Sequence, residues 1–174
     1  MSRKATAIAS NVLLWLALVV IDCDAQVSAT PPAIRAAGCL IPTSNGIVMG
    51  VNRILGKIQL PMGRHVAGEE PRQTAARETL EETGIDVDVD ALILTLENHQ
   101  IYLYLCTPKT PITDYSTLQS TDRREVSKVI VLNPHTMRNF DGTIVTNAWR
   151  FPETRVFLKA LFPYADTGNS AERK

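Results

Sequence analysis

Residues 63–85, GRHVAGEEPRQTAARETLEETGI, constrain this chain more than any other part of its 174-residue sequence. Between its proline and its last glycine, this stretch has the composition of a helix. At about 100° per residue, the side chains of Glu78, Glu81 and Glu82 fall within one arc of the helix. Like charges at this spacing destabilise a helix by about 0.2–0.5 kcal/mol per pair. The clustered carboxylates therefore need a counter-charge.

The helix is predicted to begin at Pro71 and to end at Gly84. A proline at the first helical position loses no hydrogen bond, and a glycine readily takes the left-handed conformation that ends a helix. The residues expected on the buried side of this helix are Ala75, Ala76, Leu80 and Thr83.

Two counter-charges are available to the carboxylates. Arg77 lies one turn before Glu81 and can relieve part of the repulsion. A hard divalent cation would relieve more, because Mg²⁺ takes oxygen ligands and also binds substrate phosphates. The alternative is an ordinary solvated acidic face, which leaves the clustering of the charges unexplained.

The spacing of the fixed residues resembles the signature of the Nudix hydrolases, Gly-x5-Glu-x7-Arg-Glu-U-x-Glu-Glu-x-Gly-U, where U is a bulky aliphatic residue. The chain has all of its fixed residues: Gly63, Glu69, Arg77, Glu78, Glu81, Glu82 and Gly84. Ile85 occupies the last U position. Thr79 occupies the first, and this one departure is expected to affect packing more than chemistry.

The resemblance implies an α+β (α/β) fold of the Nudix type, an α/β/α sandwich with a mixed sheet between helices, over roughly residues 32–162. It also implies a hydrolase that uses Mg²⁺ or Mn²⁺ to cleave the pyrophosphate of a nucleoside diphosphate linked to another moiety. The alternative is a Nudix-fold module that binds a nucleotide without cutting it. Such modules commonly lose a glutamate of the signature, and this chain keeps all of them.

By the same resemblance, the metal ligands would be Glu78, Glu81, Glu82 and the main-chain carbonyl of Gly63. Arg77 would hold Glu69 and Glu81 in place. The general base is left open: it is Glu78 or Glu82, or it comes from a later part of the chain, where Glu125 and the 107–124 loop are the candidates.

Several residues that are not fixed positions of the signature could also reach the substrate. His65 could touch a phosphate and His99 could reach the site, although a surface or structural role is the commoner one for such histidines. The aromatic side chains that could stack on a base are Tyr102, Tyr104 and Trp149, with a place in the core as the alternative. The hydroxyl-rich segment 107–123 is expected to be a long exposed loop.

The rest of the chain predicts a succession of strands with one further helix. Strands are expected at residues 33–41, 46–53, 57–61, 85–98, 99–108 and 125–134. Asn45-Gly46 is a strong signal for a hairpin turn. A helix is expected over 151–162, with an apolar face made by Val156, Phe157, Ala160 and Leu161.

The N-terminal segment differs from the rest of the chain. Its continuous apolar run, residues 12–21, is too short for a membrane span of about 20 residues and has the length of a secretory signal. The expected organisation is a signal peptide at 1–25, a linker at 26–33, the Nudix domain at 34–163 and a flexible tail at 164–174. The protein is accordingly expected to be exported, periplasmic or secreted. The alternative is an uncleaved membrane anchor.

Cleavage after Ala25 would leave two cysteines, Cys39 and Cys106. In an oxidising compartment they can form a disulfide, and two buried free thiols are the alternative. The 18 basic residues balance the 18 acidic ones. Because nucleic-acid binding needs a basic surface, no nucleic-acid partner is expected, and the expected partner is a small-molecule pyrophosphate. The oligomeric state is left open.

Overall fold

The computed structural model describes residues 33–98 and 100–161 of the chain. The strands are β1 (Ala36–Leu40), β2 (Pro42–Thr43), β3 (Gly46–Asn52), β4 (Ile58–Gln59), β5 (Met62–Arg64), β6 (Val87–Leu96), β7 (Ile101–Pro108), β8 (Val126–Asn133) and β9 (Arg138–Asn139). The helices are α1 (Pro71–Thr83), the short 3₁₀ helix η1 (Tyr115–Thr117) and α2 (Pro152–Leu161). The predicted signal peptide, the tail and His99 lie outside the described residues.

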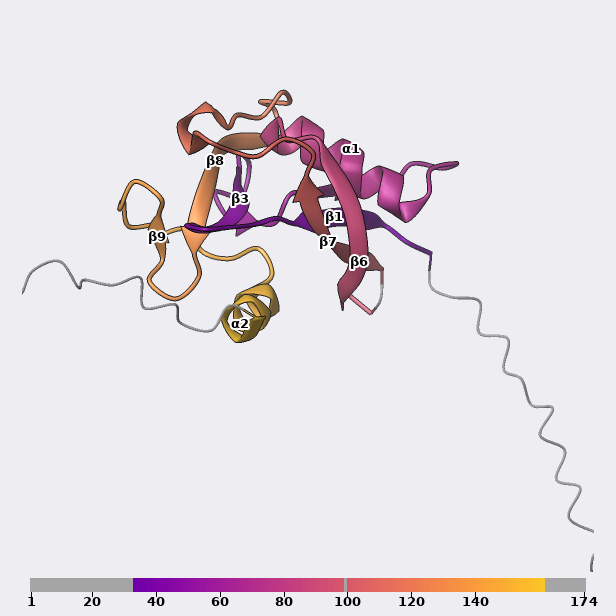
Figure 1. Ribbon diagram of the computed structural model, residues 1–174. Helices are drawn as coiled ribbons and strands as arrows, with labels where there is room; N and C mark the ends of the chain where they lie inside the picture. Colours follow the sequence, from indigo (N-terminus) through magenta and orange to yellow (C-terminus); the bar gives the residue numbers. More distant parts are fainter. Residues whose placement is uncertain (1–32, 99, 162–174) are drawn as a thin grey trace, which may run out of the picture. The chain divides into compact units, whose positions relative to one another are not determined.

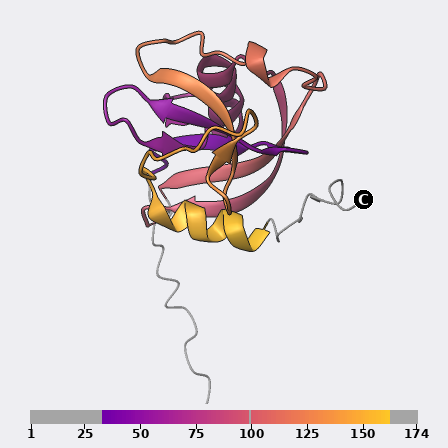
Figure 2. The same ribbon diagram turned by 90° about the vertical axis from the view of Figure 1, so that its left-hand side faces the viewer.

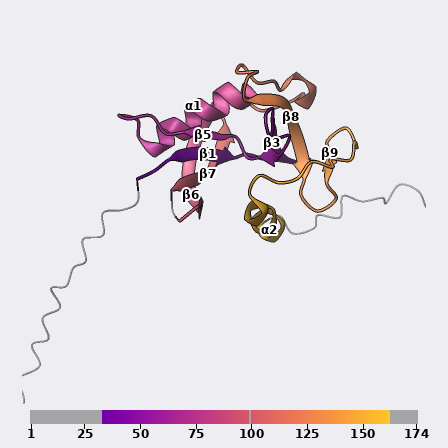
Figure 3. The same cartoon turned by 180° about the vertical axis from the view of Figure 1, so that it is seen from behind.

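The strands form two sheets. The first has the order β5-β1-β7-β6 and is mixed, because β1 and β7 run parallel while the other pairs are antiparallel. The second is antiparallel, with the order β2-β3-β8-β9 and β4 beside β3. Figure 1, Figure 2 and Figure 3 show α1 and α2 on opposite sides of these strands. The expected α+β sandwich with a mixed sheet is confirmed, with its strands divided between two sheets.

The turn signal at Asn45-Gly46 does produce a hairpin. Thr43 pairs with Gly46, so that the turn joins β2 to β3. The following strand, β3, is buried along most of its length and pairs over six positions with β8. Among the described residues, no helix is long and apolar enough to cross a membrane.

The apolar face predicted for α2 is confirmed only at Phe157, which packs against the core, and is wrong at its other three residues. The helix buries Thr154 and Leu158, whereas Val156 is 70% exposed and Leu161 is 46% exposed. The preceding segment sets this orientation, because the buried Phe151 is one turn before Thr154 and two turns before Leu158. The apolar stripe in the sequence therefore predicted the wrong position for three of its four residues, because the buried Phe151 precedes the stripe.

The two remaining cysteines form a disulfide. Cys39 on β1 and Cys106 on β7 are both buried, and the bond links two neighbouring parallel strands. Their side chains belong to the core cluster that includes Ala75 of α1. The structure therefore agrees with the disulfide interpretation and not with two free thiols.

Replacing both cysteines with alanine is expected to lower the free energy of unfolding by about 4 kcal/mol. The bond closes a loop of 67 residues, and its loss increases the entropy of the unfolded chain. Denaturant unfolding of the purified double variant and of the oxidised wild type would measure the difference. Equal midpoints and slopes would contradict the expectation.

Candidate active site

Helix α1 begins and ends where the sequence predicts. Glu70 precedes its first turn, and the Glu70 backbone N–H donates to Oε1 of Gln73 at 2.7 Å. Pro71 is its first residue. At the other end, Gly84 takes the left-handed conformation with φ of 75°, and its N–H donates to the Leu80 carbonyl at 2.9 Å. The length of the helix is therefore fixed by local chemistry.

The buried side of α1 is confirmed at Ala75 and Thr83 but differs from the prediction at Leu80. It consists of Thr74, Ala75, Glu78, Thr79, Glu82 and Thr83. Leu80, which was expected inside, is 45% exposed. Glu78 and Glu82 face inwards instead, because the Arg77 guanidinium donates to Glu78 and the Met62 N–H of β5 donates to Glu82. Thr79 is fully buried, as its proposed packing role requires, and its hydroxyl has no hydrogen-bond partner in the described part of the chain.

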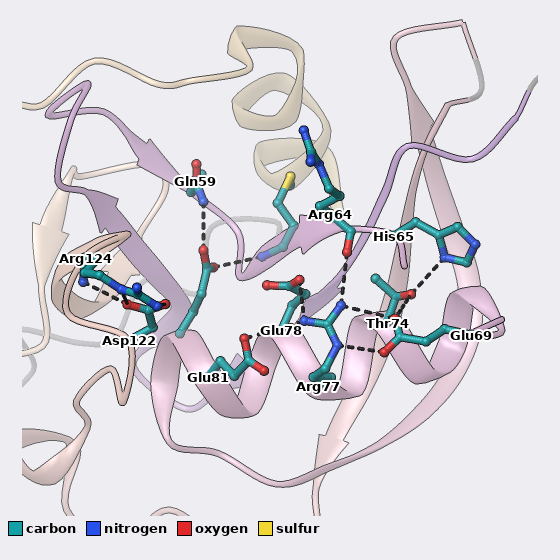
Figure 4. A network of polar contacts seen from close by, with 12 residues as sticks. Gln59, Arg64, His65, Glu69, Thr74, Arg77, Glu78, Glu81, Asp122 and Arg124 are labelled. Atoms are coloured by element: carbon teal, nitrogen blue, oxygen red, sulfur yellow. Dashed lines mark hydrogen bonds and ion pairs between the residues drawn. The ribbon is translucent and has the colours of Figure 1, made fainter. Parts of the chain in front are cut away.

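Glu82 is the most deeply buried of the clustered carboxylates, at 2% exposure. Its Oε2 accepts a hydrogen bond from the Met62 backbone N–H at 2.9 Å. Its Oε1 accepts one from the Gln59 side-chain amide at 3.3 Å, and Figure 4 marks this bond by the dashed line that ends at Gln59. Burial raises the pKa of Glu82 to about 8, against the opposing effect of the Met62 hydrogen bond, and the neighbouring Glu78 and Glu125 charges raise it further.

Glu78 packs directly against Gly63 of β5. A Cβ atom at position 63 would overlap the Glu78 carboxylate, so only glycine leaves room for it. Burial raises the pKa of Glu78, while the Arg77 guanidinium lowers it and the charges of Glu81 and Glu125 raise it again. The solvated-face interpretation of the acidic cluster therefore fails for Glu78 and for Glu82, and only Glu81 is substantially exposed.

Arg77 connects the carboxylates of this site. Its Nε donates to Glu69 Oε1 at 2.8 Å, and its Nη1 donates to Glu78 Oε1 at 2.6 Å. Nη1 also reaches Glu81 Oε2 at 3.5 Å, and Nη2 donates to the Arg64 carbonyl at 3.0 Å (Figure 4). The contacts with Glu69 and Glu81 are those predicted, and the contact with Glu78 is additional. These bonds raise the pKa of Arg77.

Glu69 and His65 belong to the same network. The Thr74 hydroxyl donates to Glu69 Oε2 at 2.7 Å, and it also lies 2.9 Å from His65 Nδ1. Since the hydroxyl proton is used by Glu69, His65 Nδ1 is the donor in the second bond. The hydrogen bonds from Arg77 and Thr74 hold the pKa of Glu69 at about 2.

The shift of Glu69 predicts an acid-dependent loss of stability. Its folded-state pKa is depressed, so its stabilising contribution is present above about pH 4.5 and is lost as the pH falls towards 2. Denaturant unfolding at pH 5 and at pH 3 should show a larger stability difference between wild type and Glu69→Gln at pH 5. A difference of the same size at both values would contradict the assignment.

A cavity of about 490 Å³ lies beside this network. Its lining residues include Arg35, Met62, Gly63, Arg64, His65, Glu125, Arg150 and Phe151. The volume is within the range of small-molecule sites. The cavity brings together the main chain of β5, the turn before β8 and the segment before α2. Of the candidates that are not fixed positions of the signature, His65 and Glu125 line the cavity.

The aromatic candidates do not lie in this cavity. Tyr104 and Trp149 are buried, and they belong to two different hydrophobic core clusters. Tyr102 packs against the cluster that contains Tyr104.

The hydroxyl-rich segment is held against the end of α1, where the Thr121 N–H and the Ser120 hydroxyl donate to the Glu81 carbonyl.

Four residues of the site had no signal that singled them out in the sequence. They are Gln59, Arg64, Arg150 and Phe151. In the sequence, Arg64 and Arg150 look like any other arginines, and Gln59 is one polar residue in a short apolar segment. Contacts between distant segments bring them to the site, as where Arg150 bonds to Gln59 and Gln59 bonds to Glu82. Within the described residues, no three histidine, cysteine or acidic side chains are already arranged around a common metal position.

Residues 32–151 match the family model of the NUDIX domain, which is more than half of the chain. The chain belongs to this family. Membership of the family supports a pyrophosphohydrolase, and the likeness to solved Nudix hydrolases supports the same fold.

Three solved structures illustrate the likeness in fold. A Nudix hydrolase family member from Chromobacterium violaceum is 22% identical, with a TM-score of 0.50, over 74% of this chain and 77% of that one. An ADP-ribose pyrophosphatase from Streptococcus suis is 14% identical, with a TM-score of 0.53, over 75% and 92%. A C. elegans Ap4A hydrolase is 18% identical, with a TM-score of 0.52, over 73% and 95%. No protein of curated function matches the sequence significantly.

Proposed function

We propose that the protein is a divalent-metal-dependent hydrolase that cleaves the pyrophosphate of a nucleoside diphosphate linked to another moiety. The observation that carries the proposal is the burial of Glu78 and Glu82 next to Glu81, beside a cavity lined with arginines. Three carboxylates would repel a pyrophosphate by themselves. With a cation between them, the same carboxylates become the means of binding it.

The residues present fit Mg²⁺ or Mn²⁺. Carboxylate and carbonyl oxygens are the ligands that these ions prefer. Burial raises the pKa values of Glu78 and Glu82, and a cation bound beside them would oppose this shift. By the resemblance to the family, Glu78, Glu81, Glu82 and the Gly63 carbonyl would hold the ion. When bound, the ion would neutralise the phosphate oxygens and lower the pKa of a water molecule.

The protein's own groups would position these ligands. Arg77 orients Glu69, Glu78 and Glu81 through its planar guanidinium. The Met62 N–H fixes one oxygen of Glu82 and leaves the other towards Gln59. Such supporting contacts typically change metal affinity or activity by about 10- to 100-fold when they are removed.

Glu125 is the general base in this proposal. It lines the cavity with Gly63, and its charge raises the pKa values of Glu78 and Glu82. Unlike those two glutamates, Glu125 is exposed and is not needed as a ligand, so it is available to take a proton from the attacking water.

Replacing Glu125 with glutamine is therefore expected to lower kcat by about 10²- to 10⁴-fold, the usual contribution of a general base. The variant should retain the Mn²⁺ affinity of the wild type, because Glu125 is not among the proposed ligands. Steady-state kinetics and a Mn²⁺ titration would check both expectations. An unchanged kcat would contradict this assignment and leave Glu78 or Glu82 as the general base.

A panel of substrates tests the proposed activity. The panel would contain ADP-ribose, dinucleoside polyphosphates, nucleotide sugars and lipid pyrophosphates. Purified protein should hydrolyse at least one of them with Mg²⁺ or Mn²⁺, and excess EDTA should abolish the reaction. Binding of a panel member without turnover would instead favour the nucleotide-binding module.

Export of the protein is a second part of the proposal. The apolar run at residues 12–21 has the length of a signal sequence, and the Cys39–Cys106 disulfide suits an oxidising compartment. The mature protein would then consist of the linker, the domain at 34–163 and the tail at 164–174. Mass spectrometry of the protein isolated from the secreted and membrane fractions should find a new N-terminus near residue 26. An intact Met1 in the membrane fraction would favour the membrane anchor.

A further inference from the structure

Arg150 is linked to the buried carboxylate of Glu82 through a single side chain. Arg150 Nη1 donates to Gln59 Oε1 at 2.7 Å, and Gln59 Nε2 donates to Glu82 Oε1 at 3.3 Å. The direction of the Gln59 amide is unambiguous, because only its oxygen can accept from a guanidinium and only its nitrogen can donate to a carboxylate. Gln59 is 2% exposed, whereas Arg150 is exposed in the cavity.

The backbone holds this arrangement from both sides. The Ile58 N–H donates to the Ala148 carbonyl at 2.9 Å, and the Arg150 N–H donates to the Ile58 carbonyl at 2.9 Å. The segment before α2 therefore runs beside β4, with Ile58 and Trp149 bridged in parallel. The guanidinium carbon of Arg150 lies 5.3 Å from the centre of the Phe151 ring, which supports its plane.

Most of the N–H donors of the Arg150 guanidinium are not used in the hydrogen bond to Gln59. A guanidinium carries five N–H donors, and one hydrogen bond accounts for one of them. In the described part of the chain, Arg150 forms no ion pair, although it lines a cavity beside the proposed metal ligands. Its remaining donors suit the bidentate binding of a phosphate group.

We infer that Arg150 binds a phosphate of the substrate and that Gln59 is a positioning residue through which this contact orients Glu82. The inference rests on the proposed function. In this arrangement, Arg150 in the cavity binds one phosphate of the diphosphate, and the metal held by the glutamates binds the other. Because a guanidinium recognises the phosphate and not the nucleoside, its contribution should be the same for every substrate that the enzyme accepts.

Kinetics of Arg150 variants test the first half of the inference. Arg150→Gln should raise KM by about 10- to 100-fold, the cost of losing a charged hydrogen bond, and by the same factor for each panel substrate. Arg150→Lys should recover only part of this loss, since lysine keeps the charge without the planar fork. An unchanged KM in Arg150→Gln would overturn the assignment.

Arg72 provides a matched control. It is exposed, it donates to one backbone carbonyl, and its guanidinium carbon also lies 5.3 Å from an aromatic ring centre, that of Tyr104. It does not line the cavity. Arg72→Gln should therefore leave KM unchanged, and an equal rise in KM for both variants would show a general effect of charge.

Metal binding tests the second half of the inference, the positioning of Glu82 by Gln59. Gln59→Met keeps the volume and removes both hydrogen bonds, so it should raise the Mn²⁺ dissociation constant by about tenfold. Arg150→Gln should weaken Mn²⁺ binding in the wild-type background but not in the Gln59→Met background, because the coupling runs through Gln59. Strictly additive effects would overturn the role of Gln59. Circular dichroism would verify that each variant is folded.

The two proposals can fail separately. Titrations with Mn²⁺ and with inorganic pyrophosphate need no turnover. If the wild type binds both ligands, and Arg150→Gln weakens pyrophosphate binding, the inference holds even where the substrate panel finds no hydrolysis. If hydrolysis is found and Arg150→Gln binds pyrophosphate as tightly as the wild type, the proposed function holds and the inference fails.

Discussion

Replacing Glu82 with glutamine is expected to reduce the Mg²⁺-dependent kcat by more than about 100-fold. Glu82 is a proposed metal ligand, and even residues that only support such ligands cost about 10- to 100-fold when removed. The fold should persist, because the glutamine carbonyl can still accept the hydrogen bond from the Met62 N–H. Steady-state kinetics and thermal unfolding of the same preparation would measure the two properties.

The matched control for this variant is Glu153→Gln. Glu153 is an exposed glutamate in the first turn of α2 and lies outside the cavity. It should retain wild-type kinetics. If Glu82→Gln does not fold, Glu81→Gln serves in its place, since the Glu81 side chain is 44% exposed and its replacement leaves the core unchanged. Wild-type turnover in either folded variant would contradict its proposed role as a metal ligand.

Replacing Arg77 with glutamine is expected to lower both stability and activity. The guanidinium bonds to Glu69 and Glu78, reaches Glu81 and also binds the Arg64 carbonyl. Its loss leaves the Glu78 carboxylate buried without a charged partner, which should cost about 2 kcal/mol after allowance for the 30% exposure of the Arg77 side chain. We expect kcat/KM to fall by about 10- to 100-fold.

Arg77→Lys separates charge from geometry at this position. Lysine retains the positive charge but lacks the planar arrangement of donors that reaches several carboxylates at once. We expect this variant to regain part of the stability and little of the activity. Denaturant unfolding and kinetics of the three proteins would test this order, and full activity in Arg77→Lys would show that charge alone suffices.

Much of the fold followed from local chemistry. Pro71 and Gly84 define α1, and Asn45-Gly46 defines a hairpin, because these residues act through their own backbone conformations. The signature spacing likewise brought Arg77 to Glu69 and Glu81, since all three lie on or beside one helix. Features of this kind depend on few distant contacts.

Other features depended on contacts between distant segments. Helical periodicity placed Leu80 in the core, but the helix turns its carboxylates inwards because Met62 and Arg77 receive them. The orientation of α2 is likewise set by Phe151, outside the predicted apolar face. Gln59 and Arg150 lie 91 residues apart, and only the pairing of β4 with the segment before α2 joins them.

Solvent labelling tests the central claim most directly. The reaction of the best panel substrate would be run with Mg²⁺ in ¹⁸O-labelled water, and the products would be analysed by mass spectrometry. Cleavage within the pyrophosphate by water predicts two phosphorylated products, one of which carries a single solvent oxygen, and no product when EDTA is present. Unlabelled phosphate groups, cleavage elsewhere in the substrate, or full activity in EDTA would contradict the account.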